Sequence, residues 1–253
     1  MKKIKAIPVF IALFILFGIS AFAQNNSDKK PQKGFAVLEL FTSEGCSSCP
    51  PADELMGRIQ NEYKDSQVYV LAYHVDYWDR QGWKDIFSNP EYTKRQYDYA
   101  KWLGKEPIYT PQLVVNGKKD YIASDEASVR NAVKNTLSKP DNNLEFSVEV
   151  ISINNRLNLS YSVTGISKNT KLVLAVVQKS AKSNVKRGEN AHRILSHYQI
   201  VKQLNSITLK NNGKGNTTIS EPKDFNTKDF EIIAFVQDMN SGAILGAEKA
   251  IIN

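Results

Sequence analysis

The sequence predicts a mixed α/β domain followed by an all-β domain. Between residues 34 and 137, short apolar runs of strand length alternate with stretches that carry apolar residues at helical spacing. This alternation is typical of a mixed sheet flanked by helices. The polar segment 138–143 interrupts the pattern and is expected to be a linker. From 144 to 253, apolar and polar residues alternate in short runs without a long helical period, which predicts a β-sandwich.

The first 23 residues have the parts of a secretory signal peptide: three lysines, an apolar run over residues 7–19 and Ala-Phe-Ala at 21–23. The apolar run is too short for a membrane anchor. We therefore expect cleavage after Ala23, a flexible polar leader over 24–33, and a mature protein without a membrane span. Its expected location is the periplasm or the exterior of a bacterial cell.

The charge of the chain is poor evidence for nucleic-acid binding. The formal net charge of +7 falls to +4 once Lys2, Lys3 and Lys5 leave with the signal peptide. The remaining basic residues are scattered among almost as many acidic ones, so we expect no nucleic-acid partner.

The first half of the α/β domain leads into the two cysteines of the chain, Cys46 and Cys49. The apolar run 35–41 predicts a strand, and a turn follows it. From Ser47 onward the apolar spacing predicts a helix, with prolines and acids in its first turns. The run 67–75 is apolar throughout, which favours a strand covered on both faces.

The second half of this domain begins with an irregular aromatic stretch over residues 77–89. A helix is predicted from Pro90 to Gly104, since proline is favoured at the start of a helix and glycine at its end. Asn116-Gly117 then predicts a two-residue hairpin turn. A last helix is expected over 124–137, while in the all-β part the shift of alternation at residue 151 suggests a bulge.

Three kinds of chemistry are open to a cysteine pair two residues apart. A structural disulfide would close a loop of four residues and add only about 2 kcal/mol. Zinc would need two further ligands at fixed spacing, which the chain lacks, although copper with Cys46, Cys49 and His74 stays open as an alternative. A redox couple suits an exported chain best, since an exposed Cys46 at a helix start gains from the helix dipole and a shielded Cys49 can resolve a mixed disulfide.

A proline some sixty residues later adds to the redox interpretation. Thr110-Pro111 stands directly before a predicted strand, where proline cannot donate a ladder hydrogen bond. An ordinary trans bond is the usual state of such a pair. In a thioredoxin-like layout, this proline is cis and lies against the cysteine pair.

The order of elements with CxxC at a helix start and Thr-Pro before a hairpin resembles the thioredoxin core. More closely, LELFTSEGCSSCPPADELM, LAYHVDYWDRQGWKD, YTPQLVVNG and KRGENAHRILSHYQIVKQL resemble an exported thioredoxin-like family, domain of unknown function 1223. The thioredoxin resemblance implies that Cys46 attacks, that Cys49 resolves, and that Pro111 is the cis-proline with Thr110 before it. Gly45 and Ser47-Ser48 depart from the residues usual there, which leaves the direction of redox flow open.

Several further residues are candidates for auxiliary roles. His74 and Asp76 end the second predicted strand and are expected at the same sheet edge as the cysteines. His74 could take part in proton transfer, or simply be held by backbone groups at the strand end. Asp76 could equally cap the turn that follows. Trp78 and Trp83 could line a substrate surface, or attach their loop to its own domain. The polar loop with Arg187, Glu189, His192 and Arg193 is by default a solvated or interdomain loop, with a lid over the cysteines as the alternative.

These observations favour a thiol-disulfide oxidoreductase that acts on protein or small-molecule thiols and disulfides, with the Cys46–Cys49 disulfide as its only cofactor. A membrane electron donor or acceptor is a further expected partner. The alternatives are a copper chaperone that uses Cys46, Cys49 and His74, and a binding module that has lost redox activity.

Overall fold

The computed structural model describes residues 34–139, 144–166, 169–209 and 213–253, and these form one compact unit. The predictions of a signal peptide and leader over residues 1–33 lie outside the described residues. So does most of the predicted linker, of which residues 138 and 139 are described.

The predicted elements around the cysteines are confirmed. Strand β1 (Ala36–Thr42) leads through a turn to helix α1 (Pro50–Glu62), and strand β2 (Val68–His74) runs parallel to β1. The segment between β2 and the next helix contains only one short 3₁₀ helix, η1 (Asp79–Gln81). Thr42 pairs with His74 in the register, so the ends of the two strands meet at the edge of the sheet that carries the cysteines.

The remaining elements of the first part also follow the predicted order. Helix α2 (Pro90–Leu103) ends at Gly104 in the left-handed conformation. Strands β3 (Gln112–Val115) and β4 (Lys119–Ile122) form an antiparallel hairpin, and helix α3 (Glu126–Leu137) follows. The predicted two-residue turn is wrong, because Val115 pairs with Lys119 and leaves Asn116, Gly117 and Lys118 between the strands. The Asn116 side chain instead bonds to the backbone of Phe35 and Val37.

The second part of the chain is all β in its described residues. Its strands are β5 (Phe146–Ile153), β6 (Arg156–Val163), β7 (Thr170–Asn184), β8 (Ile194–Thr208), β9 (Lys214–Ser220), β10 (Phe230–Asp238), β11 (Ile244–Lys249) and β12 (Ile251–Ile252). The bulge predicted at Ile151 is wrong: β5 and β6 pair without a register shift, and Ile151 stays on the exposed face.

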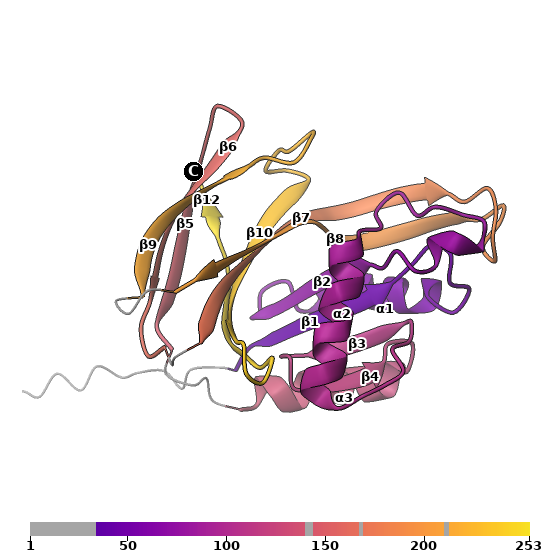
Figure 1. Cartoon of the computed structure of the whole chain (residues 1–253), viewed down its shortest axis with the longest axis horizontal. Coiled ribbons are helices and arrows are strands. Elements are labelled where there is room, and N and C mark those ends of the chain that lie inside the picture. The colour runs from indigo at the N-terminus through magenta and orange to yellow at the C-terminus, as the bar shows by residue number, and fades with distance from the viewer. Residues whose placement is uncertain (1–33, 140–143, 167–168, 210–212) are drawn as a thin grey trace, which may run out of the picture. The chain divides into compact units, whose positions relative to one another are not determined.

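The strands assemble into two sheets. One has eight strands in the order β11-β10-β7-β8-β2-β1-β3-β4, and the other has four in the order β12-β5-β6-β9. The long hairpin β7–β8 joins the two parts of the chain, since Ile200 of β8 pairs in parallel with Ala72 of β2 (Figure 1). One mixed α/β sheet therefore runs through both parts.

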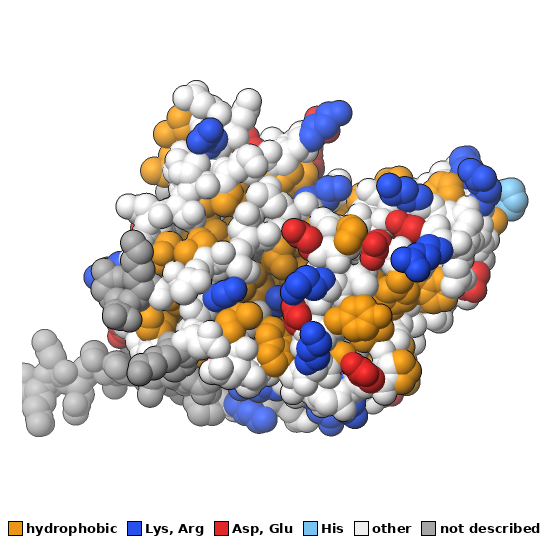
Figure 2. Space-filling view, in the orientation of Figure 1, with side chains coloured by type: hydrophobic (Ala, Val, Ile, Leu, Met, Phe, Trp, Pro, Cys, Tyr) orange, Lys and Arg blue, Asp and Glu red, His pale blue; other side chains and the backbone are white. Residues whose placement is uncertain are grey.

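Three apolar cores hold these layers. Helix α2 covers one face of β1 and β2, with Tyr92 and Tyr99 packed against Phe41 and Tyr73. Helices α1 and α3 cover the other face, so β1 and β2 are both covered on two sides, as the apolar run 67–75 predicts for β2. The third core lies between the four-stranded sheet and strands β7 and β10. On the face shown in Figure 2, Lys and Arg side chains lie among acidic and apolar ones.

Candidate functional site

The two cysteines lie in the turn between β1 and α1. Cys49 is the N-cap residue of α1, and its backbone N–H donates a 3.2 Å hydrogen bond to the carbonyl oxygen of Cys46. Both thiols are free, and the exposed residues of the motif are the intervening Ser47 and Ser48. Proline at the first helical positions suits this arrangement, because those positions have no intrahelical acceptor for an N–H.

The surroundings of the two thiols shift their pKa values in opposite directions. The pKa of Cys46 is lowered to about 6, chiefly because the Cys49 thiol hydrogen-bonds to its sulfur, with further hydrogen bonds from Ser48 and Thr110. The Sγ atom of Cys46 lies 3.2 Å from the hydroxyl of Ser48. Burial and the hydrogen bond with Cys46 raise the pKa of Cys49. Cys46 is therefore the more acidic thiol of the pair and Cys49 the less acidic one.

Thr110 and Pro111 lie against this turn. The Thr110–Pro111 peptide bond is cis, and the carbonyl oxygen of Thr110 lies 3.9 Å from Sγ of Cys46. Trp78 donates a 2.8 Å hydrogen bond from Nε1 to the Thr110 hydroxyl. A Cβ atom at Gly45 would lie only 3.1 Å from Cβ of Trp78, so the small residue before Cys46 lets the aromatic loop pack close to the turn.

A buried carboxyl group stands behind Cys49. Asp53 lies one helical turn after Cys49 and is 3% exposed, and burial raises its pKa to about 7. The hydroxyl of Thr42 donates a 3.2 Å hydrogen bond to Oδ2 of Asp53. Thr42 also hydrogen-bonds to Cys49, which makes its hydroxyl a link between thiol and carboxyl group.

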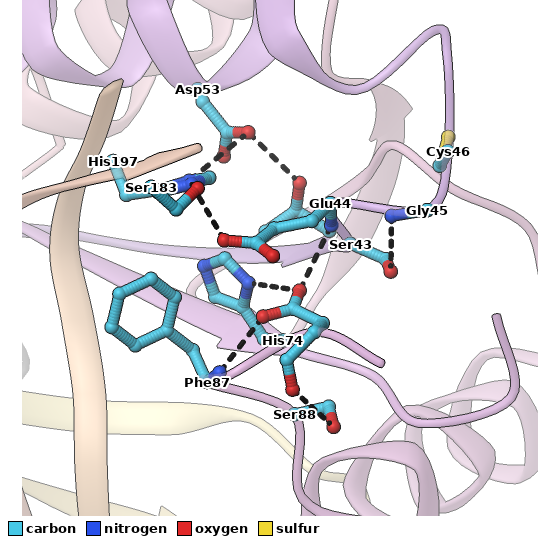
Figure 3. A network of polar contacts seen from close by, with 12 residues as sticks. Ser43, Glu44, Gly45, Cys46, Asp53, His74, Phe87, Ser88, Ser183 and His197 are labelled. Atoms are coloured by element: carbon cyan, nitrogen blue, oxygen red, sulfur yellow. Dashed lines mark hydrogen bonds and ion pairs between the residues drawn. The ribbon is translucent and has the colours of Figure 1, made fainter. Parts of the chain in front are cut away.

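Asp53 belongs to a network of buried polar side chains (Figure 3). His197, from β8, has Nδ1 at 3.9 Å from Asp53 and Nε2 at 3.3 Å from Glu44. The Nε2 atom also lies 3.1 Å from the hydroxyl of Ser183 on β7. The network therefore joins the residues around the cysteine turn to the hairpin from the second part of the chain.

His74 belongs to this network. Its Nδ1 atom lies 2.7 Å from Oδ2 of Asp85, which also accepts a 2.9 Å hydrogen bond from the backbone N–H of Glu44. Burial by itself would raise the pKa of Asp85, but the charge of His74 and these hydrogen bonds hold it below its usual range. The ring of His74 is fully buried and turned away from Cys46 (Figure 3). His74 thus lies at the predicted edge, but its polar partner is Asp85.

The other predicted auxiliary residues have separate partners. Asp76 accepts a 2.5 Å hydrogen bond from the hydroxyl of Thr93 on α2. Trp83 donates a 2.6 Å hydrogen bond from Nε1 to Oε2 of Glu44. Trp78 therefore lies beside the cysteine turn, Trp83 joins its loop to the network, and Asp76 ties the same loop to a helix.

The loop between β7 and β8 reaches the cysteine turn. Glu189 accepts a 2.9 Å hydrogen bond from the backbone N–H of Ser47. Asn190 is not among the predicted residues, yet its Nδ2 atom donates 2.9 Å hydrogen bonds to the carbonyl oxygens of Glu44 and Cys46. Arg193 supports Asn190 with a 2.6 Å hydrogen bond to Oδ1. Arg187 and His192 are exposed.

The predicted exposure of Cys46 is wrong. Cys46 is 1% exposed and Cys49 is fully buried. The loop residues Glu189 and Asn190 on one side, and Thr110 with Trp78 on the other, surround the turn. The sequence could not reveal the part of this burial that Glu189 and Asn190 contribute, because their contacts join residues more than 140 positions apart.

The network also bears on the copper alternative. In the part of the chain that the structure describes, no three His, Cys, Asp or Glu side chains are grouped so that they could hold a metal ion. His74 directs one ring nitrogen to Asp85, and no contact brings it to the cysteine sulfurs among the described residues.

Some of the missed residues do leave a signal in the sequence. Asp53 follows Cys49 by four positions, and residues four apart share one face of a helix. His197 occupies an inward position in the alternation of β8, between the buried Leu195 and Gln199. A histidine at a core position of a strand needs polar partners, which indicates a buried network.

The fold and the site together define a mixed α/β protein with a free cysteine pair at a helix N-terminus. The chain belongs to the family described as protein of unknown function DUF1223, whose family model matches residues 37–237. No curated protein matches the chain.

Two solved structures are similar to different extents. A crystal structure of a structural-genomics target from Agrobacterium tumefaciens is 27% identical, covers 86% of this chain and 95% of that chain, and has a TM-score of 0.66. A domain of the outer membrane lipoprotein Omp28 from Porphyromonas gingivalis is 15% identical, covers 44% of this chain and 87% of that chain, and has a TM-score of 0.25, which is too low to support an inference. Among the described residues, no helix has the length and apolar character needed to cross a membrane.

Proposed function

We propose that this protein is an exported thiol-disulfide oxidoreductase in which Cys46 attacks and Cys49 resolves. The observation that carries the proposal is the division of acidity within the pair, with the pKa of Cys46 lowered to about 6 and the pKa of Cys49 raised. A structural disulfide has no need for such a division, whereas stepwise exchange requires one thiolate and one thiol in reserve.

The topology supports a thioredoxin-like interpretation of the first part. Strand β1 lies between β2, parallel to it, and β3, antiparallel to it, with helices on both faces. The cis bond before Pro111 and the contact from Thr110 to Cys46 suit the same interpretation. The second part, in which a four-stranded sheet packs on β7 and β10, is compatible with the β-sandwich interpretation.

The proposed reaction has two exchange steps. The Cys46 thiolate attacks one sulfur of a substrate disulfide, so that a Cys46–substrate bond forms while the substrate S–S bond breaks. The second substrate sulfur leaves as a thiolate and takes a proton from water. Cys49 then loses its proton and attacks Sγ of Cys46, which releases the first substrate sulfur. The cysteine pair loses two electrons and the substrate gains them; the reverse sequence oxidises a dithiol.

Thr42 and Asp53 offer a path for the proton of Cys49. The thiol proton passes to the Thr42 hydroxyl as the hydroxyl proton passes to the Asp53 carboxylate, which leaves a Cys49 thiolate and a neutral carboxyl group. The pKa of Asp53, raised to about 7 by burial, suits a proton acceptor at neutral pH.

Trapping of the mixed disulfide tests the proposal. Cys49→Ala should accumulate a covalent adduct on Cys46 after incubation with glutathione disulfide, detected by intact-protein mass spectrometry, while the wild-type protein should release glutathione. The Cys46→Ala, Cys49→Ala double variant is the matched control. No adduct on Cys49→Ala would refute the proposal. Stoichiometric copper in reduced protein purified without oxygen would favour the copper chaperone.

A further inference from the structure

Two residues of the segment between β7 and β8, residues 185–193, make three hydrogen bonds with the backbone on either side of the Cys46 side chain. Asn190 donates from one side chain to the carbonyl oxygens of Glu44 and Cys46, and Glu189 accepts from the N–H of Ser47. Asn190 is fully buried, while Glu189 lies at the surface. Asn190 is thus the anchor of the segment and Glu189 its outer contact.

The segment is ordered by its own hydrogen bonds. The N–H of Val185 donates to the carbonyl of Arg193 at 3.0 Å, and the N–H of His192 donates to the carbonyl of Val185 at 2.8 Å. Arg193 in turn holds the oxygen of the Asn190 side chain. The amide of Asn190 is therefore presented to the turn in one orientation, with both of its ends bonded.

The segment also packs on the aromatic loop that borders the cysteines. Gly188 has a φ of +78°, and a Cβ atom there would lie 3.2 Å from Cβ of Trp83. Trp83 donates to Glu44, the residue whose carbonyl oxygen Asn190 also holds. The cysteine turn, the aromatic loop and the segment 185–193 are consequently interlocked.

We propose that Asn190 and Glu189 are specificity-determining residues, which keep segment 185–193 seated over Cys46 so that small thiol and disulfide compounds react in preference to protein disulfides. The proposal rests on the proposed function for its biological meaning. Attack on a disulfide needs the partner sulfur in line with Sγ of Cys46, and this atom belongs to a residue that is 1% exposed. On this proposal the segment is the part of the enclosure that opens, so a folded protein reaches Sγ only after the segment leaves, whereas a small molecule needs a smaller opening.

Access can be measured without any disulfide chemistry. In the Cys49→Ala background, Cys46 is alkylated with N-ethylmaleimide and, separately, with a maleimide that carries a long polyethylene glycol chain. The reactive group is the same, so the ratio of the two rates reports access and not thiolate content. Both reagents are compared at the same pH, so the thiolate content of Cys46 is the same for both and cancels in the ratio.

The wild-type segment should lower the ratio of polymer to small-reagent rates by about tenfold or more relative to the same protein in denaturant. Asn190→Ala should raise the ratio about fivefold or more. Glu189→Ala should raise it by less, because the two hydrogen bonds from Asn190 to the cysteine turn remain. Arg187→Ala is the matched control: Arg187 lies in the same segment and makes no hydrogen bond or ion pair with the cysteine turn among the described residues, so the ratio should not change.

An unchanged ratio in both Asn190→Ala and Glu189→Ala would overturn the proposal, as would a native wild-type ratio equal to that in denaturant. Glu189 is exposed, so Glu189→Ala gives a result even if Asn190→Ala does not fold, and circular dichroism checks both. Alkylation does not depend on adduct formation with glutathione. If the alkylation ratio shows a barrier but no glutathione adduct forms, the barrier stands and the redox function is rejected. If the adduct forms but the ratio shows no barrier, the redox function stands and the barrier is rejected.

Discussion

The hydroxyl of Thr42 lies 3.2 Å from Oδ2 of Asp53 and also hydrogen-bonds to Cys49. A carboxyl group with a raised pKa is thus connected to the less acidic cysteine by one side chain. The same carboxyl group lies 3.9 Å from Nδ1 of His197, which belongs to the second part of the chain. The proton chemistry expected of Cys49 therefore depends on residues from both parts.

Asp53→Asn should slow the resolving step. An ionised Asp53 is needed to accept a proton, so in the wild-type protein the rate of mixed-disulfide resolution should rise with pH through about 7. The amide of the variant cannot accept the proton, and the rate should fall by about a hundredfold and lose this rise. Rapid-quench mass spectrometry of the glutathione adduct measures it. Thr42→Ser, which keeps the hydroxyl, should retain most of the rate, whereas Thr42→Val should not. Equal rates in Asp53→Asn and wild type would exclude the proton path.

Asp53→Asn should also stabilise the folded protein above neutral pH. The pKa of Asp53 is about 7 in the folded protein, against about 3.9 in an unfolded chain. Between these pH values the folded state holds a proton on Asp53 that the unfolded state lacks. The contribution of Asp53 to the free energy of unfolding is therefore fully present at low pH and is lost as the pH rises toward 7.

Because the amide of the Asp53→Asn variant never ionises, the variant should exceed the wild type by about 2–4 kcal/mol in free energy of unfolding at about pH 8, and the difference should shrink toward about pH 4. Urea denaturation at both pH values checks this. A variant that is less stable than the wild type at the higher pH would contradict the burial argument. This measurement does not depend on redox activity.

Ser48 should contribute to the acidity of Cys46. The Ser48 hydroxyl lies 3.2 Å from Sγ of Cys46, and a hydrogen bond to a charged group is worth about 1.5 kcal/mol. Ser48→Ala should therefore raise the pKa of Cys46 by about one unit. Cys49→Ala should raise it further, since Cys49 is the largest cause of the lowered value. The thiolate absorbance as a function of pH gives the pKa. Ser47→Ala is the control, because Ser47 contacts Glu189 through its backbone, and its substitution should leave the pKa unchanged.

The sequence predicts the local elements of this protein well and their long-range connections poorly. The strand at 35–41 and the helix after Cys49 follow from apolar spacing and from proline and acid positions, which are local properties. The pairing of β8 with β2 does not follow from local properties, because the single parallel pair of Ala72 with Ile200 leaves no periodicity in either segment.

The candidate site shows the same limit. Motif and element order point to Cys46, Cys49, Thr110 and Pro111, and the structure brings them together. The charged residues of the loop between β7 and β8 are the predicted candidates for a lid. The side chain that bonds to the carbonyl oxygen of Cys46 is instead the uncharged Asn190 of the same loop.

Gly57 gives a further example of a constraint that the sequence does not carry. A Cβ atom there would lie 2.7 Å from the ring of Tyr198, so α1 and β8 pack closely at this point. The sequence of α1 alone gives no sign of this contact, because Tyr198 lies in the second part of the chain.

Arg95→Ala should be strongly destabilising, because it would leave a buried carboxylate without its cation. Arg95, on α2, pairs with the fully buried Glu39 of β1 at 2.7 Å and also donates to Gln237 of β10. Removal of one partner of a buried ion pair costs about 3–5 kcal/mol, whereas replacement of both by neutral groups of similar volume costs much less. The Glu39→Gln, Arg95→Met double variant should therefore be more stable than Arg95→Ala in urea denaturation. Lys94→Ala, which removes an exposed pair with Asp98 on the same helix, should change stability by no more than about 0.5 kcal/mol. If Arg95→Ala lost no more stability than Lys94→Ala, the contacts of Arg95 with Glu39 and Gln237 would not be a structural link between the two parts of the sheet.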